Sequence, residues 1–193
     1  MSRRRPAELF SWDEQRGTIV FAPANRRVFI INAHAWGLIE DDLLAHFHKG
    51  ASPLLLEMGT AYGRAIALDY RSVEGDPENV TSFFEHLGLA SGWGRFSISG
   101  DLAKGSKITV KVSDCVFCES RNLSAGSNDQ CHFIVGVCKG IADVVFGFPH
   151  FASETKCRSR GDGLCEIVVG RATGSEGAAR TSGPDPMTDA SQK

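Results

Sequence analysis

The stretch from Cys131 to Cys165 holds four of the chain's six cysteines, and a glutamate, Glu154, lies close to two of them. Its apolar character predicts a helix over residues 130–146. Two strands, over residues 154–157 and 164–169, are predicted on either side of a glycine-rich turn. This stretch constrains the fold more than any other, because the rest of the chain must support it and enclose a pocket beside it.

The spacing of these residues decides which of them can share a metal ion. Cys157 and Cys165 flank a turn centred on Gly161, so a hairpin would place their Cβ atoms about 5 Å apart. Glu154 lies three residues before Cys157, and residues three apart in a regular strand point to opposite faces. Glu154 can therefore join Cys157 only if the backbone bulges or the strand begins between them. Cys131 lies at the start of the predicted helix, whose positive end favours a thiolate.

Three thiolates and one carboxylate make a closed tetrahedral set, which favours a structural zinc ion over a catalytic one. Two other interpretations fit the same residues. Free cysteines are commonly buried as small apolar side chains without any metal. A rival zinc set pairs the Cys115-x-x-Cys118 motif with Cys157 and Cys165, because two intervening residues are typical of zinc ligands. Spacing alone leaves all three interpretations open.

Hydrophobic periodicity predicts the other elements of the chain. Helices are expected over residues 33–48, over residues 52–70 and from Asp76–Pro77 onward. Hairpins are expected to join residues 17–22 to 27–31 and residues 93–99 to 106–113. Asn32 is the predicted N-cap of the first helix, because its side chain can accept hydrogen bonds from free backbone N–H groups.

Two of the predicted helices carry pairs of glycines four residues apart. These pairs are Gly59 with Gly63 and Gly136 with Gly140. Residues four apart lie on one helix face, so each pair lets another element approach closely. The apolar face of the helix over 52–70 is predicted to contain Leu55, Met58, Tyr62 and Ile66.

Composition predicts one globular domain, over residues 10–171, with a flexible arm over 1–9 and a disordered tail over 172–193. Charged residues make up 23% of the chain and its net charge is −2, so nothing in the charge favours direct contact with nucleic acid or an acidic membrane. The sequence has no signal peptide and no apolar run long enough to span a membrane. We therefore expect a cytoplasmic protein, in which thiols stay reduced.

Several motifs together resemble the 4-vinyl reductase domain family, and in particular the sensory domains of bacterial activators that respond to phenols and other aromatics. The strongest is the spacing of Cys131, Glu154, Cys157 and Cys165. The others are Gly17-Thr-Ile-Val-Phe with Arg26-Arg27-Val-Phe-Ile, the two glycine pairs, and Gly92-Trp93-Gly94. The resemblance covers about residues 10 to 170.

The resemblance implies an α/β (α+β) fold in which an antiparallel sheet packs against several helices around a hydrophobic pocket. The same ligand-binding fold occurs in the vesicle-tethering TRAPP subunits. In the phenol sensors the residues that match Cys131, Glu154, Cys157 and Cys165 bind a structural zinc ion. Members of the family are often homodimers.

The chain departs from the phenol sensors where they recognise their ligand. Val137 and Ile141 stand where those sensors have tyrosines, and Val112 stands where they have a tryptophan. Phe117 and Cys118 replace a glutamate and an alanine. A buried phenol hydroxyl needs a polar partner, so phenol binding does not carry over and a more apolar pocket is expected. The residues predicted to line it are Val112, Cys115, Phe117, Phe133, Val137 and Ile141.

These observations favour a small-molecule sensor that signals through a downstream regulatory protein or through dimerisation, with a small hydrophobic or aromatic ligand. The alternative is an accessory protein or reductase of bacteriochlorophyll biosynthesis that binds a tetrapyrrole, although the sequence lacks a G-x-G-x-x-G nucleotide fingerprint. A third interpretation is a protein-interaction module with a vestigial pocket. A binding module is favoured over an enzyme, because no catalytic arrangement is evident; His150, just before a predicted strand, is expected to be exposed.

Overall fold

The computed structural model describes residues 9–73, 79–119 and 131–172. Its main sheet is antiparallel, with strand order β4-β5-β7-β6. The strands are β4 (Arg95–Gly100), β5 (Lys107–Ser113), β6 (His150–Lys156) and β7 (Cys165–Arg171). The predicted hairpin before Cys115 and the predicted hairpin around Gly161 are both confirmed, the latter with longer strands.

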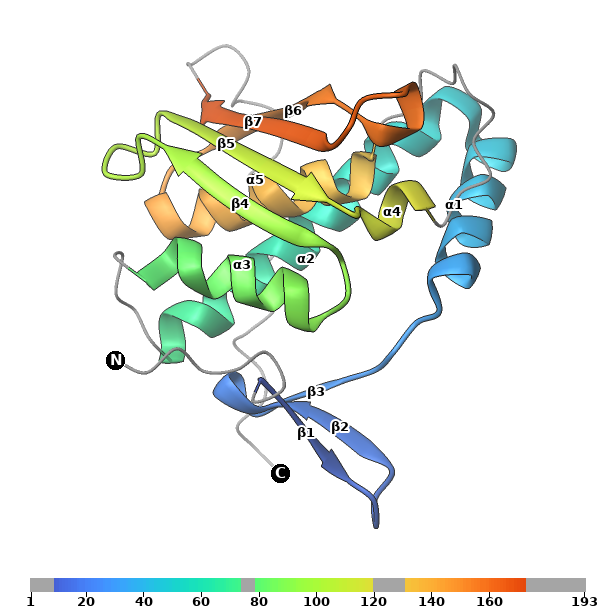
Figure 1. Ribbon diagram of the computed structural model, residues 1–193, viewed down its shortest axis with the longest axis vertical. Coiled ribbons are helices and arrows are strands. Elements are labelled where there is room, and N and C mark those ends of the chain that lie inside the picture. The colour runs from blue at the N-terminus through green and yellow to red at the C-terminus, as the bar shows by residue number, and fades with distance from the viewer. Residues whose placement is uncertain (1–8, 74–78, 120–130, 173–193) are drawn as a thin grey trace, which may run out of the picture.

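Helices pack against this sheet, so the expected α+β fold is confirmed. They are α1 (Ala33–Phe47), α2 (Ala51–Val73), α3 (Val80–Ala90), the single-turn α4 (Val116–Glu119) and α5 (His132–Phe146). Helix α5 contacts β6 and β7 on one side and α2 on the other, while α3 contacts β4 (Figure 1). The predicted opening of the third helix at Asp76–Pro77 lies outside the described residues, as do most residues of the predicted arm and tail, although Leu9 is described and buried.

A second, smaller antiparallel sheet lies below the main body in Figure 1. It has the order β1-β2-β3, with β1 (Phe10–Asp13), β2 (Thr18–Phe21) and β3 (Arg26–Val28). The predicted hairpin of β2 and β3 is confirmed, and β1 adds a strand that periodicity did not predict. Strand β3 ends at Val28, whereas the sequence predicted a strand as far as residue 31. Residues 29–31 instead form an extended connection towards α1, in which Phe29, Ile30 and Ile31 are exposed.

The contact between α2 and α5 depends on glycines from both helices. A Cβ atom on Gly59 would lie 2.0 Å from the backbone oxygen of Phe133, and one on Gly136 would lie 2.1 Å from that of Leu56. Gly63 and Gly140 are similarly close to backbone oxygens of the facing helix. The predicted close approach at both glycine pairs is therefore confirmed.

The same contact corrects the predicted apolar face of α2. Met58 and Tyr62 are exposed, although periodicity assigned them to the buried face with Leu55. The buried positions that contact α5 instead include small residues, because only small side chains allow two helix backbones to come this close. The predicted N-cap of α1 is confirmed, since Asn32 Oδ1 accepts hydrogen bonds from His34 N at 2.8 Å and Ala35 N at 3.2 Å. No helix in the described ranges combines the length and apolar character that crossing a membrane requires.

Candidate functional site

The β6–β7 hairpin brings Glu154 and Cys157 to the same side. Glu154 pairs with Ile167, but Lys156 pairs with Glu166, so the register shifts by one residue at Thr155. This irregularity is the bulge that the three-residue spacing required. Glu154 and Cys157 are consequently both buried, and Cys165, also buried, begins the facing strand.

The N-terminus of α5 meets this hairpin. Cys131 occupies the N-cap position of the helix, and its backbone N–H donates a hydrogen bond to Glu154 Oε2 at 3.0 Å. The Sγ atoms of Cys131 and Cys157 are 3.8 Å apart. The ligand atoms of the predicted set, Cys131, Glu154, Cys157 and Cys165, all lie within 4.8 Å of one another. The four residues thus converge from two strands and a helix.

Two more thiols lie beside this set. Cys118, on α4, has its Sγ 3.1 Å from that of Cys131, 3.2 Å from that of Cys165 and 3.6 Å from that of Cys157. Cys115 precedes α4, and its sulfur lies within 4.8 Å of those of Cys118, Cys131 and Cys165. The structure therefore joins the two sets that spacing treated as rivals into one cluster. Cys138 belongs to neither four-residue set.

The chemistry of the cluster fits a metal ion. Glu154 Oε1 is buried and has no hydrogen-bond partner among the described residues, which is costly unless a cation or proton satisfies it. Buried thiolates with a carboxylate at these separations suit a soft or borderline divalent ion such as zinc. These residues can therefore hold a metal ion in a closed site.

The ionisation of the cluster reflects burial and mutual contact. Burial raises the pKa of the Glu154 carboxyl to about 8, the N–H of Cys131 opposes the rise, and the nearby thiols Cys157 and Cys118 add to it. Hydrogen bonds from the surrounding thiols, of which Cys115 contributes most, lower the pKa of Cys118. Burial raises the pKa of Cys138 to about 12, so this thiol stays protonated.

A cavity of about 80 Å³ lies between α3, α5 and the sheet. Val137 and Ile141, on α5, are among its lining residues. Its other lining residues are almost all apolar, and they include Ile66, Val80, Phe84, Leu87, Trp93, Phe96, Ile98, Ile108, Val110, Ile134, Cys138, Val145, Phe146 and Val169. The lining contains no charged side chain among the described residues, which agrees with the expected apolar pocket.

The other four predicted pocket residues lie elsewhere in the same core. Val112, Cys115, Phe117 and Phe133 are buried but are not among the residues that line the cavity. Phe117 and Phe133 instead pack in an aromatic cluster with Trp36, Tyr62 and Trp93, through tilted and edge-to-face contacts. Sequence reasoning missed the α3 side of the cavity, although the apolar periodicity around Phe84 offered a signal for it.

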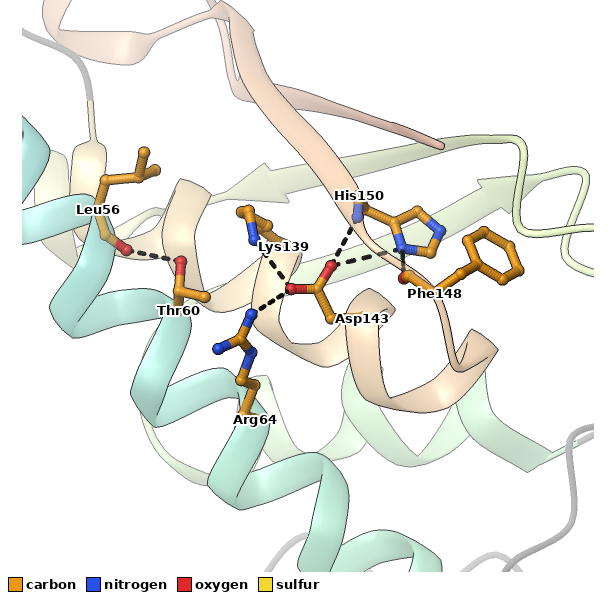
Figure 2. Close-up of polar contacts among 7 residues, drawn as sticks. All are labelled: Leu56, Thr60, Arg64, Lys139, Asp143, Phe148 and His150. Carbon is orange, nitrogen blue, oxygen red and sulfur yellow. Dashed lines mark hydrogen bonds and ion pairs between the residues drawn. The ribbon is translucent and has the colours of Figure 1, made fainter. Parts of the chain in front are cut away.

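A polar network fixes the other end of α5 (Figure 2). Asp143 Oδ2 accepts hydrogen bonds from Arg64 Nη2 and Lys139 Nζ, each at 2.8 Å, and Oδ1 accepts one from His150 N at 2.7 Å. His150 is only 2% exposed, so the expectation that it is exposed was wrong. Its ring is held between the backbone oxygens of Phe148 and Gly105, each 2.9 Å from a ring nitrogen. The network joins α2, α5 and the sheet, and it therefore helps to position α5.

Solved structures share this fold. The phenol-responsive sensory domain of the transcription activator PoxR, solved with phenol, is 17% identical, with a TM-score of 0.72 and 86% of each chain covered. A vinyl-4-reductase family protein from Methanocaldococcus jannaschii is 19% identical (TM-score 0.55; 76% of this chain and 85% of that one). A trafficking protein particle complex subunit 3 from Naegleria fowleri, covalently bound to palmitic acid, is 13% identical (TM-score 0.54; 74% and 96%).

These likenesses confirm the fold that the sequence motifs suggested, including its relation to the vesicle-tethering subunits. No protein-family profile matches the sequence, and no curated protein matches it either. At identities below 20% the comparisons establish shared architecture, and function must be argued from the site itself.

Proposed function

We propose that this chain is a small-molecule-binding sensory module with a structural zinc site and a hydrophobic pocket. One observation carries the proposal: helix α5 contributes its N-cap residue Cys131 to the thiol cluster and, about two to three turns later, Val137 and Ile141 to the apolar cavity. A metal at one end of α5 would therefore hold one wall of the pocket in place. The similarity in fold to a phenol-responsive sensory domain supports the same conclusion.

The zinc site in this proposal is structural. Cys131, Cys157 and Cys165 supply three thiolates, and both Glu154 and Cys118 are close enough to supply the fourth donor. A zinc ion with four protein donors has no open position for substrate. It would join the start of α5 to the β6–β7 hairpin, which in turn pairs with β5.

The proposed ligand is small and hydrophobic or aromatic. The PoxR domain was solved with phenol and the Naegleria subunit with palmitic acid, and here the lining offers only apolar contacts apart from Thr81, the Trp93 ring and the Cys138 thiol. An unpaired hydroxyl in such a pocket would cost roughly 1–3 kcal/mol. We therefore propose a ligand without a hydroxyl, such as an aromatic hydrocarbon, in preference to phenol.

Signal output in this proposal passes through a homodimer or a downstream regulatory protein in the cytoplasm, without direct contact to nucleic acid. The supporting observation is a group of exposed apolar side chains on the connection to α1 and on α1 itself: Phe29, Ile30, Ile31, Leu38, Ile39 and Phe47. A second copy of the chain would remove this surface from water.

The tetrapyrrole alternative has less support. The cavity of about 80 Å³ is small beside the roughly 300–1,000 Å³ of typical cofactor pockets. An absorbance titration with a divinyl tetrapyrrole tests tetrapyrrole binding directly. A spectral shift at stoichiometric concentration would support the tetrapyrrole alternative.

Native mass spectrometry combined with metal analysis tests the zinc site. We expect one zinc ion per chain, lost together with folded structure when Cys131, Cys157 and Cys165 are all replaced by serine. Thermal unfolding in the presence of toluene and of phenol tests the pocket, and we expect a larger rise in melting temperature with toluene. A chain that folds without metal, or that phenol stabilises more than toluene does, would contradict the corresponding part of the proposal.

A further inference from the structure

The thiol cluster contains more donors than one tetrahedral ion can use. Five buried cysteines and the buried Glu154 bring their ligand atoms together in two overlapping sets. Only four can bind a single zinc ion in a closed site. The sequence motif that matches the phenol sensors indicates Glu154 as the fourth donor. The arrangement of the sulfur atoms favours Cys118 instead.

Cys118 has its sulfur close to all three sulfurs of the motif, whereas Cys115 is grouped with only two of them, Cys131 and Cys165. The Cys118 Sγ lies 3.1 Å from that of Cys131, 3.2 Å from that of Cys165 and 3.6 Å from that of Cys157. Four sulfurs around one zinc ion, each about 2.3 Å from it, are about 3.8 Å apart. The observed separations, together with 3.8 Å between Cys131 and Cys157, are close to this value. These four sulfurs need only small shifts to surround a zinc ion.

Glu154 already has another role. Its Oε2 accepts the hydrogen bond from the backbone nitrogen of Cys131 at 3.0 Å, which satisfies an N–H at the start of α5. To become a ligand, the carboxylate would have to bind through Oε1 while keeping this bond. As an acceptor through Oε2 it still orients Cys131, in the way that groups around a metal site commonly orient the ligands. In this arrangement a proton, and not the metal ion, would satisfy the buried Oε1.

Two ion pairs connect the segment that carries Cys118 to the β6–β7 hairpin. Arg158, in the turn between Cys157 and Cys165, pairs at 2.6 Å with Glu119, the last residue of α4, and at 3.7 Å with Asp114, two residues before the helix begins. Helix α4 lies at the same end of the sheet as this turn (Figure 1). The guanidinium also places a positive charge beside a thiolate-rich site, which reduces the cost of burying its negative charge.

We infer that Cys118 is the fourth metal ligand, so that Cys118, Cys131, Cys157 and Cys165 form a four-sulfur site and Glu154 supports Cys131 from outside it. The inference rests on the proposed zinc site and specifies its donor set. Four thiolates make a softer site than three thiolates and a carboxylate, and softer sites favour thiophilic ions. The chain should therefore retain cadmium more strongly than a variant with an oxygen donor at position 118.

X-ray absorption at the zinc edge tests the inference on the full-length, zinc-loaded protein. Sulfur neighbours lie at about 2.3 Å from zinc and oxygen neighbours at about 2.0–2.2 Å, so the two donor sets are distinguishable. We expect four sulfurs in the wild-type chain and in Glu154→Gln. We expect three sulfurs and one oxygen in Cys118→Ser, a substitution of nearly equal size. Cys115→Ala and Cys138→Ala are matched controls and should keep four sulfurs.

The outcomes separate the inference from the zinc site on which it rests. A wild-type spectrum with three sulfurs and one oxygen, or a sulfur count that changes with Cys115→Ala and not with Cys118→Ser, overturns the inference and leaves the zinc site standing. A protein that folds without zinc overturns both. Cadmium competition gives a second measurement, because the ratio of cadmium to zinc affinity should fall at least tenfold in Cys118→Ser and stay unchanged in Glu154→Gln.

Discussion

The carboxylate of Asp143 accepts a hydrogen bond from the backbone nitrogen of His150 at 2.7 Å, which ties the last turn of α5 to the first residue of β6. Arg64 from α2 and Lys139 from α5 pair with the other oxygen (Figure 2). The thiol cluster holds the opposite end of α5. The helix that carries the cavity wall is therefore fixed at both ends by polar groups.

Replacing Asp143 with asparagine should destabilise the protein by about 2 kcal/mol at pH 7, because two charged hydrogen bonds lose their acceptor charge. Burial opposes ionisation of Asp143, but hydrogen bonds from His150, Lys139 and Arg64 outweigh it and hold the pKa of this carboxyl well below its usual range. Urea unfolding monitored by circular dichroism measures the change. Asp42→Asn, on the exposed surface of α1, is the control and should have little effect.

The same network predicts a pH dependence. A carboxyl whose pKa is lower in the folded state contributes stability that is complete above its unfolded pKa of about 3.9. That stability is lost as pH falls through the folded pKa. The difference in unfolding free energy between wild type and Asp143→Asn should therefore shrink as the pH is lowered from 6 towards about 3. A difference that stays constant over this range would show that the charge of Asp143 is not the source of the stabilisation.

Gly136→Ala should destabilise the protein by about 1–3 kcal/mol, because the added Cβ would lie 2.1 Å from the backbone oxygen of Leu56. Helix propensity alone predicts the opposite sign, since alanine is favoured over glycine by about 1 kcal/mol. Gly50→Ala is a suitable control, because its Cβ would have no atom within 4 Å. Thermal and urea unfolding of both variants distinguish the two effects, and a stabilised Gly136→Ala would contradict the close helix contact.

Ile141→Phe should fill the cavity and abolish the rise in melting temperature that toluene produces. The side chain of Ile141 lines the cavity, whereas Phe117 does not. Phe117→Leu, which alters the aromatic cluster instead, should leave the toluene effect in place despite some loss of stability. If Phe117→Leu removes the effect and Ile141→Phe does not, the ligand binds at the aromatic cluster and not in the cavity.

Ile30→Glu should convert the proposed homodimer into a monomer without unfolding it. Ile30 is 71% exposed and Phe29 is 85% exposed, so charge at this position costs the isolated chain little, whereas a buried charge in a dimer interface is strongly unfavourable. Light scattering after size-exclusion chromatography measures the mass. Leu89→Glu, at an exposed apolar position on α3, is the control and should leave the mass unchanged. A monomeric wild-type chain would contradict the dimer.

Much of the candidate site was predictable because it depends on local spacing. A bulge was required to bring Glu154 and Cys157 together, and the register shift at Thr155 provides it. The place of Cys118 was not predictable in the same way. Cys118 and Cys131 are 13 positions apart in the sequence and belong to different elements, and spacing between elements does not determine which thiols meet.

Most elements, and the contacts within one hairpin or between the glycine faces of two helices, were predictable from the sequence, because they follow from periods of two and 3.6 residues and from steric limits on glycine. The packing of separate elements was needed to show which face of α2 is buried, that His150 is enclosed between two backbone oxygens, and that Phe117 lies outside the cavity. Each depends on how separate elements pack in three dimensions, and local periodicity carries no information about the partner that a side chain meets.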